Sequence, residues 1–126
     1  MKIAIPVWEG KVSPVFDTAS RLLVFDVEDA REIKRFQASL DEKDLGRRCS
    51  RIKGLGIELL ICGAISSQFR DMLMASGVKV ISWISGQTEE VVKAYLNGKL
   101  CDPKFLMPGH GEEHMKEMAK ICDRRK

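Results

Sequence analysis

Two histidines and a cysteine near the end of the chain have the residue types and spacing that could hold a metal. His110 and His114 are four residues apart, and Cys122 continues the same four-residue step. On a helix, residues four apart lie about 6 Å from each other, so the two histidines could share one ion. Cys122 would lie about 12 Å along the axis from His114 and could not join them. A full site would need further ligands from Cys101, a loop of the core or a second subunit. A site of imidazole and thiolate ligands suits zinc, copper or iron.

The stretch from His110 to His114 also spells H-x-x-E-H, a string found in a class of zinc peptidases. Such a site needs both histidines on a continuous helix, together with a third ligand. The proline and glycines at 108–111 instead place a helix start near His110, and the chain ends at residue 126, twelve residues after His114. We therefore exclude a peptidase.

The same tail also fits an ordinary amphipathic helix. Met115, Met118, Ala119 and Cys122 have the i, i+3, i+4, i+7 spacing of a face that packs on a core. Acidic residues come early in the tail and basic residues late, as the helix dipole favours. The sequence favours this plain helix and leaves a histidine-based metal or cluster site as the alternative.

The composition is that of a soluble globular chain. It has 126 residues, a net charge of +3 and four cysteines, none in a C-x-x-C pair. This argues against a disulfide framework, a zinc knuckle and a nucleic-acid-binding surface. No apolar run reaches the about 18 residues of a membrane span, and no secretory signal opens the chain. We expect a cytoplasmic protein with one α/β domain over residues 1–103 and a tail over 104–126, helical from about residue 111.

Hydrophobic patterning predicts five strands and three helices in the first domain. The strands are expected at 2–7, 21–28, 31–38, 58–62 and 78–83, and the helices at 41–55, 68–75 and 88–96. Strands joined through helices must be parallel, whereas 21–28 and 31–38 form a hairpin that ends at a sheet edge. The pattern predicts a three-layer α/β/α sandwich with one hairpin-linked antiparallel strand.

Helical spacing also predicts which side chains of two helices face inward. In the first helix these are Leu45, Cys49, Ile52 and Leu55, and in the second Phe69, Met72 and Leu73. The basic cluster Arg47, Arg48, Arg51 and Lys53 is expected to form a solvated helix face.

Three loops should meet where ligands collect in open α/β sheets, beyond the carboxyl ends of the parallel strands. They span 8–19, 63–67 and 84–88, and contain the candidate binding residues Gly63, Ser66, Ser67, Gly86 and Thr88. Helices are expected to begin at Ser66/Ser67 and at Thr88, and their free N–H groups would attract an anion. The alternative is that these hydroxyl residues only cap the helices, with Thr88 as an N-cap.

Motifs of common catalytic sites are absent from the sequence. There is no P-loop, no G-x-G-x-x-G and no G-x-S-x-G, and the first strand carries no carboxylate for a two-metal nuclease. The sequence therefore gives no support to these hydrolase, nucleotide-binding and nuclease sites.

Three stretches together carry a resemblance to a known family. MKIAIPVWEGKVSPVFDTASRLLVFDVE (1–28), ELLICGAIS (58–66) and VKVISWISGQTEEVVKAYLNGKL (78–100) resemble the dinitrogenase iron–molybdenum cofactor biosynthesis family, the NifX-like domains. The resemblance covers most of residues 1–107. It implies a ribonuclease-H-like fold with a five-stranded mixed sheet whose second strand is antiparallel. It also implies a non-enzymatic role in binding or carrying an iron–sulfur or iron–molybdenum cluster or its precursor.

The resemblance also marks the first loop as a binding element, with two departures. The family loop often reads Ser-Pro-His-Phe-Gly; Ser13 and Phe16 match it, whereas Val15 replaces the histidine and Asp17 the glycine. Valine cannot coordinate a metal. Some relatives place a cysteine pair after Met-Pro-Gly, where this chain has His110.

We expect a small metallocluster-binding or carrier protein that works with a cluster donor or acceptor protein. The three loops would form the cradle, including Ser13, Phe16 and Asp17, and His110, His114 or Cys122 would supply ligands. The alternative is a small regulatory or binding module for an anionic small molecule or a protein partner, without metal.

Overall fold

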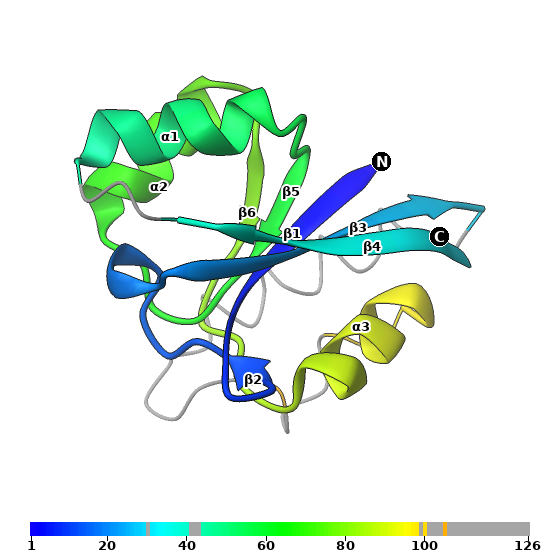
Figure 1. The fold of residues 1–126 in the computed structure, drawn as a ribbon. Helices are drawn as coiled ribbons and strands as arrows, with labels where there is room; N and C mark the ends of the chain where they lie inside the picture. Colours follow the sequence, from blue (N-terminus) through cyan, green and yellow to red (C-terminus); the bar gives the residue numbers. More distant parts are fainter. Residues whose placement is uncertain (30, 41–43, 99, 101–104, 106–126) are drawn as a thin grey trace.

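A computed structural model describes residues 1–29, 31–40, 44–98, 100 and 105, shown in Figure 1. The strands are β1 (Lys2–Trp8), β2 (Lys11–Val12), β3 (Arg21–Glu28), β4 (Arg31–Ser39), β5 (Leu59–Ile61) and β6 (Lys79–Ile81). The helices are the short 3-10 helix η1 (Phe16–Thr18), α1 (Leu45–Gly54), α2 (Ser67–Ala75) and α3 (Thr88–Leu96). The predicted C-terminal helix and the histidines on it lie outside the described residues.

The sheet has the order β4-β3-β1-β5-β6, with β2 paired to the end of β1. β1, β5 and β6 run parallel, and β3 runs antiparallel to both β1 and β4. This confirms the mixed sheet with its second long strand antiparallel and the hairpin arm at the edge. The two-residue strand β2 was not predicted; it follows a tight turn at Glu9 and Gly10, whose φ angles are 51° and 78°.

Helices cover both faces of the sheet, with α1 and α2 on one side and α3 on the other (Figure 1). The alternation of side chains along β1 decides which residues face which layer. Ile3 and Ile5 belong to the core under α3, whereas Ala4 belongs to the core under α1 and α2. Each fully buried isoleucine, leucine or phenylalanine stabilises the fold by about 1.5–3 kcal/mol, so these two cores hold the three layers together.

Several predicted boundaries and faces differ from the structure. The strands predicted at 58–62 and 78–83 are shorter, since β5 ends at Ile61 and β6 at Ile81. Beyond β6, Trp83 takes a φ of 65°, which no strand residue adopts. Met72 is 37% exposed rather than inward, whereas Phe69 and Leu73 are buried as predicted.

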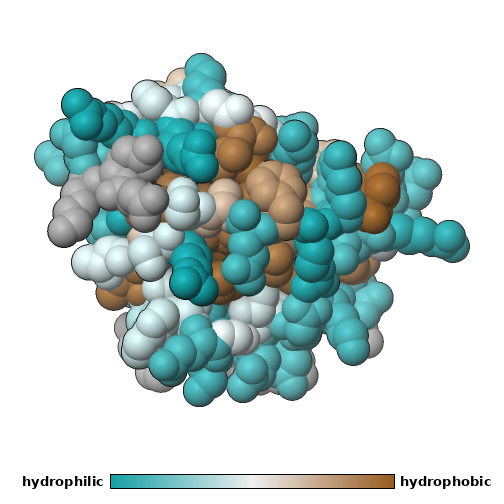
Figure 2. Space-filling model, viewed as in Figure 1, coloured by the Kyte–Doolittle hydropathy of each residue, from teal (hydrophilic) through white to brown (hydrophobic). Residues whose placement is uncertain are grey.

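The surface seen from the side of Figure 1 is mostly hydrophilic, with a few apolar side chains near its middle (Figure 2). Exposed apolar residues on the edge strand include Ile33 and Phe36. None of the described helices is long and apolar enough to cross a membrane.

Candidate functional site

The three predicted loops meet at the carboxyl edge of the parallel strands. The loop after β1 reaches both of the others: the Phe16 N–H donates to the Ala64 carbonyl (2.8 Å), and the Val12 N–H donates to the Gly86 carbonyl (3.0 Å). The Trp83 N–H also donates to the Gly63 carbonyl at 2.8 Å. Backbone hydrogen bonds therefore fix the relative positions of the three loops, as ligand-binding loops on a rigid scaffold require.

The first loop approaches Gly63 so closely that no side chain fits there. A Cβ at this position would lie 2.6 Å from the Pro14 carbonyl oxygen and 2.7 Å from that of Ser13. Ser13 is itself buried, and its hydroxyl donates to the Val15 carbonyl at 3.3 Å. The close approach at Gly63 and the hydrogen bond of Ser13 thus hold the loop in place. Val15, in the same loop, is 40% exposed.

Phe16 anchors this loop in the core under α1 and α2. Its ring is fully buried and packs edge to face against Phe69, with the ring centroids 4.9 Å apart. Arg48 of α1 lies with its guanidinium carbon 6.0 Å from the centroid of the same ring. The predicted binding residue Phe16 is therefore part of the packed interior.

Arg48 contradicts the prediction of a fully solvated basic helix face. It is only 3% exposed, its Nη1 donates to the Phe16 carbonyl at 3.4 Å, and its Nε has no hydrogen-bond partner. The spacing could have shown this, because Arg48 lies three residues after Leu45 and four before Ile52, on the apolar face of α1. The face that was predicted to be solvated therefore includes one buried residue, Arg48.

The side chain of Asp17 lies at the start of α2. Its carboxylate accepts a hydrogen bond from the Ser66 N–H at 3.0 Å, and the Ser66 hydroxyl accepts one from the Phe69 N–H at 3.3 Å. Ser66 is thus the N-cap that the sequence suggested, and Ser67 opens the helix. An internal carboxylate already supplies the negative charge that this helix start favours.

The two described cysteines are poor metal ligands as they stand. Cys62 is fully buried, and its pKa is raised by burial and, to a smaller extent, by the charge of Asp17. Burial also raises the pKa of Cys49. Because the thiolate is the form that binds metals, the burial and the raised pKa values disfavour both side chains as ligands.

Thr88 is the first residue of α3 and not its N-cap, which is Gln87. The Thr88 side chain therefore does not cap the helix. Thr88 is 6% exposed, and its hydroxyl is buried without a hydrogen-bond partner. Its backbone N–H donates to the Gly10 carbonyl at 3.0 Å, which joins the start of α3 to the turn after β1.

A Thr88→Val variant should be more stable than the wild-type protein. The change removes an unsatisfied buried hydroxyl and keeps the branched shape, so the free energy of unfolding should rise by about 1 kcal/mol. Denaturant unfolding measures this difference. Thr18→Val at an exposed site is the matched control and should stay within about 0.5 kcal/mol. A destabilised Thr88→Val would show that the hydroxyl has a partner.

A cavity of about 430 Å³ lies beside the start of α3. Val7 and Leu23 of the sheet line it together with Thr88 and Glu89 of the helix and Arg35 of β4. A second hollow of about 450 Å³ shares Val7, Gly10 and Gln37 with it and extends to Trp8. The site is therefore larger than the loops alone and includes the edge strand.

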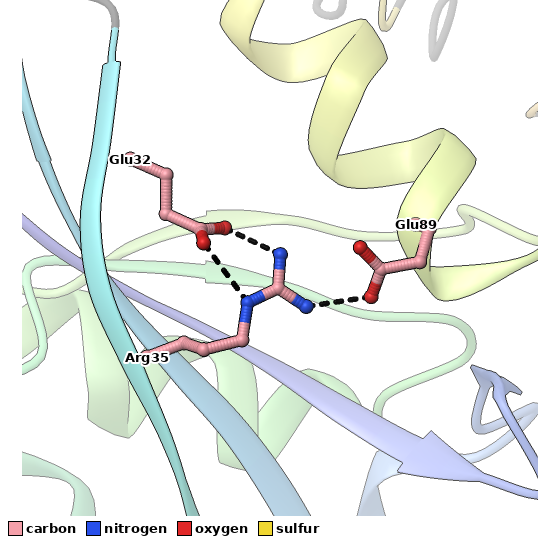
Figure 3. Close-up of polar contacts among 3 residues, drawn as sticks. All are labelled: Glu32, Arg35 and Glu89. Carbon is pink, nitrogen blue, oxygen red and sulfur yellow. Dashed lines mark hydrogen bonds and ion pairs between the residues drawn. The ribbon is translucent and has the colours of Figure 1, made fainter.

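Arg35, which lines this cavity, joins β4 to α3 through its hydrogen bonds (Figure 3). It donates to Glu32 through Nε and Nη2, at 3.0 and 2.6 Å, and to Glu89 of α3 through Nη1 at 2.6 Å. The bonds to Glu32 and Glu89 raise the pKa of Arg35, and the bond from Arg35 lowers the pKa of Glu89. Arg35 could not be identified from the sequence, because only the fold brings residues 54 positions apart together.

The predicted binding residues thus fall into two groups, and the predicted metal ligands are not among them. Ser13, Phe16 and Asp17 lie with Gly63, Ser66 and Ser67, whereas Gly86 and Thr88 lie at the start of α3, where Thr88 lines the Arg35 cavity. His110, His114 and Cys122 lie outside the described residues. Within the described part of the chain, no three His, Cys, Asp or Glu side chains gather as metal ligands would.

Comparisons with known proteins agree with this fold. A family model described as dinitrogenase iron-molybdenum cofactor matches residues 1–98, and no curated protein matches the chain. The crystal structure of PH0822 superposes with a TM-score of 0.74 at 22% identity, covering 79% of this chain and 91% of that one. A candidate dinitrogenase from Methanocaldococcus jannaschii gives 0.64 at 16% identity, covering 79% and 90%. The apo orange protein from Desulfovibrio gigas gives 0.64 at 21% identity, covering 78% and 88%.

Proposed function

We propose that this chain, which belongs to the dinitrogenase iron–molybdenum cofactor family, binds or carries an iron–sulfur or iron–molybdenum-type cluster or a precursor of one. It would do so without catalysing a reaction. Membership implies involvement in the biosynthesis or binding of this cofactor. The family match over residues 1–98 is the observation that carries the proposal. The partner would be a protein that donates the cluster or accepts it.

The donor set of the described domain does not fit a cluster by itself. Val15 takes the loop position where the family often has histidine, and Cys49 and Cys62 are buried with raised pKa values. The sulfur and nitrogen donors that suit iron would therefore come from the tail, from Cys101 or from a second subunit. We assign this role to His110 and His114, or to Cys122, which lies too far along a helix to join them. The loops at 13–17 and 63–67 would be the rigid surface beside which the cluster is held.

A rigid cradle with ligands on a separate segment suits a carrier better than a storage site. Transfer to another protein requires that ligands leave the cluster one at a time, and few protein ligands make that exchange easier. The loops, by contrast, are fixed by backbone hydrogen bonds such as those of Phe16 and Trp83. They would give the partner protein a constant surface to recognise.

Anaerobic reconstitution of the full chain with iron and sulfide tests this function. We expect a visible absorption band with bound iron and sulfide in the wild-type protein, and loss of most of it in a His110→Ala/His114→Ala/Cys122→Ala variant, because the donors are gone. Lys116→Ala/Lys120→Ala, in the same tail but without donors, should behave like the wild type. A wild-type protein that takes up no cluster, or a triple variant that keeps all of it, would contradict the proposal.

A further inference from the structure

We propose that the tail of this chain, residues 106–126, docks in the groove between β4 and the start of α3. This groove consists of the two hollows described above, which share Val7, Gly10 and Gln37. The inference goes beyond the proposed cluster role and does not depend on it. The part of the tail that enters the groove is its predicted apolar face, formed by Met115, Met118, Ala119 and Cys122.

The layer that contains α3 leaves the edge strand β4 uncovered. Opposed residues of an antiparallel pair point to the same face of the sheet, so Gln37, opposite Leu23, lies on the α3 side. Arg35, opposite Phe25, lies on this side for the same reason. Both β4 residues are exposed, whereas Ala38, on the other face, is buried with the core under α1 and α2. Among the described helices, α3 lies alone on its side of the sheet (Figure 1), and its layer stops short of the edge.

The groove has the apolar lining and the size to take up side chains of a helix. Val7, Leu23 and Phe36 line it, and Phe36 is 43% exposed. Its larger apolar part measures about 430 Å³, within the about 300–1,000 Å³ of pockets that enclose a bound group. Methionine side chains adapt well to gaps of irregular shape. Native proteins also commonly cover an edge strand with a helix or a loop, because its backbone groups are unpaired.

The chain leaves the described core next to this groove. Phe105, the last described residue, is 3% exposed, and its carbonyl accepts a hydrogen bond from the Ser85 N–H at 2.7 Å. Its ring would lie 3.5 Å from a Cβ built on Gly86. Two residues further on, the Thr88 N–H donates to the carbonyl of Gly10, which lines both hollows. Residue 106 therefore starts close to the place where the tail is proposed to dock.

The length of the tail matches the strand that it would cover. A helix from about residue 111 to 126 is about 24 Å long, and the five residues before it reach up to about 17 Å. The nine residues of β4 extend over about 30 Å. Because the tail is tethered beside the groove, its effective concentration there is in the millimolar range, so a modest apolar contact is sufficient. This advantage favours the chain's own tail over a second copy or another protein.

Charges at the two ends of the β3–β4 hairpin fit a tail that runs from the carboxyl edge of the sheet toward the hairpin turn. Arg21, exposed at the carboxyl edge, would lie near the two glutamates at 112–113. Glu28 and Asp29, exposed at the turn, would lie near the three basic residues at 124–126. Exposed ion pairs add little stability, but complementary charges fix the orientation of a docked segment.

Methyl NOE spectroscopy of the metal-free, full-length protein tests the proposal. We expect NOEs from the methyl groups of Met115 or Met118 to those of Val7 and Leu23. In a sample that mixes labelled and unlabelled chains, the isotope-filtered spectrum should lack these NOEs, because each tail occupies the groove of its own chain. NOEs that appear in the filtered spectrum would put the tail of a second copy in the groove and would overturn the proposal.

Met115→Ala/Met118→Ala should shift the methyl signals of the groove, because alanine keeps the helix but removes the side chains that fill the cavity. Lys116→Ala/Lys120→Ala, in the same tail, is the matched control and should leave these signals at their wild-type positions. Equal shifts in the two variants, tail NOEs to another surface, or no tail NOEs at all would contradict the proposal. The same spectra show whether each variant is folded. Because no metal is present, these outcomes are separate from success or failure of cluster reconstitution.

Discussion

A Gly63→Ala variant should lose about 2–4 kcal/mol of stability, out of the about 5–15 kcal/mol typical of a small domain. The new methyl group would lie 2.6 Å from the Pro14 carbonyl oxygen and 2.7 Å from that of Ser13. Both neighbours are backbone atoms, so the overlap cannot be relieved by rotating a side chain. Chemical denaturation monitored by tryptophan fluorescence measures the loss.

The expected loss of stability arises from a steric clash and not from the backbone conformation of Gly63. Gly63 is not among the glycines with positive φ, so alanine could adopt its dihedral angles. The first loop must move away instead, and the bond from the Ala64 N–H to the Pro14 carbonyl (2.8 Å) is the first to break.

Gly54→Ala is the matched control for the Gly63 variant. Gly54 lies in α1 with nothing within 4 Å of an added Cβ, so alanine should leave stability unchanged or raise it by up to about 1 kcal/mol. Equal effects at the two positions would mean that the close approach of the loop at Gly63 does not exist in solution.

The second large effect is expected for Phe16→Ala, which should destabilise the protein by about 3–5 kcal/mol. The ring is fully buried, and its removal leaves a cavity beside Phe69. It also removes the aromatic face that lies near the buried guanidinium of Arg48. An uncompensated buried charge is costly, so the loss should lie at the upper end of the range. Thermal and denaturant unfolding measure it.

Phe36→Ala is the control, because it deletes the same side chain from a position that is 43% exposed. It should cost much less than Phe16→Ala. If the two variants lose the same stability, Phe16 is not a core residue. It would then be available for ligand contact, as the sequence alone had suggested.

Most of the fold could be predicted from the sequence, because hydrophobic periodicity reports burial directly. β3 matches its predicted range of 21–28 in full, and the direction of every long strand follows from hairpin and crossover rules. The strand ends at 61 and 81 could not be placed, because apolar residues continue beyond them into loops that are also buried, as at Cys62 and Ile84.

The candidate site was only partly predictable, because sequence patterns report local features and the site depends on long-range contacts. The three loops and the cap at Ser66 follow from local turn and helix-start signals. One hydrogen bond joins Asp17 to Ser66, 49 positions apart, and another joins Arg35 to Glu89, 54 positions apart. No pattern in a single sequence indicates such long-range pairs. The Thr88 assignment was wrong by one residue, which is the usual uncertainty at helix ends. The assignments of His110, His114 and Cys122 stay predictions, as does the domain boundary at residue 103.

X-ray absorption at the iron edge tests the central claim most directly, since it reports the atoms bound to iron in the reconstituted full-length protein. We expect sulfur neighbours together with a nitrogen shell from His110 and His114 in the wild type, and loss of that nitrogen shell in His110→Ala/His114→Ala. An unchanged nitrogen shell in the double variant, or a wild-type protein that retains no iron, would contradict the account of a family member that carries a cluster on its tail histidines.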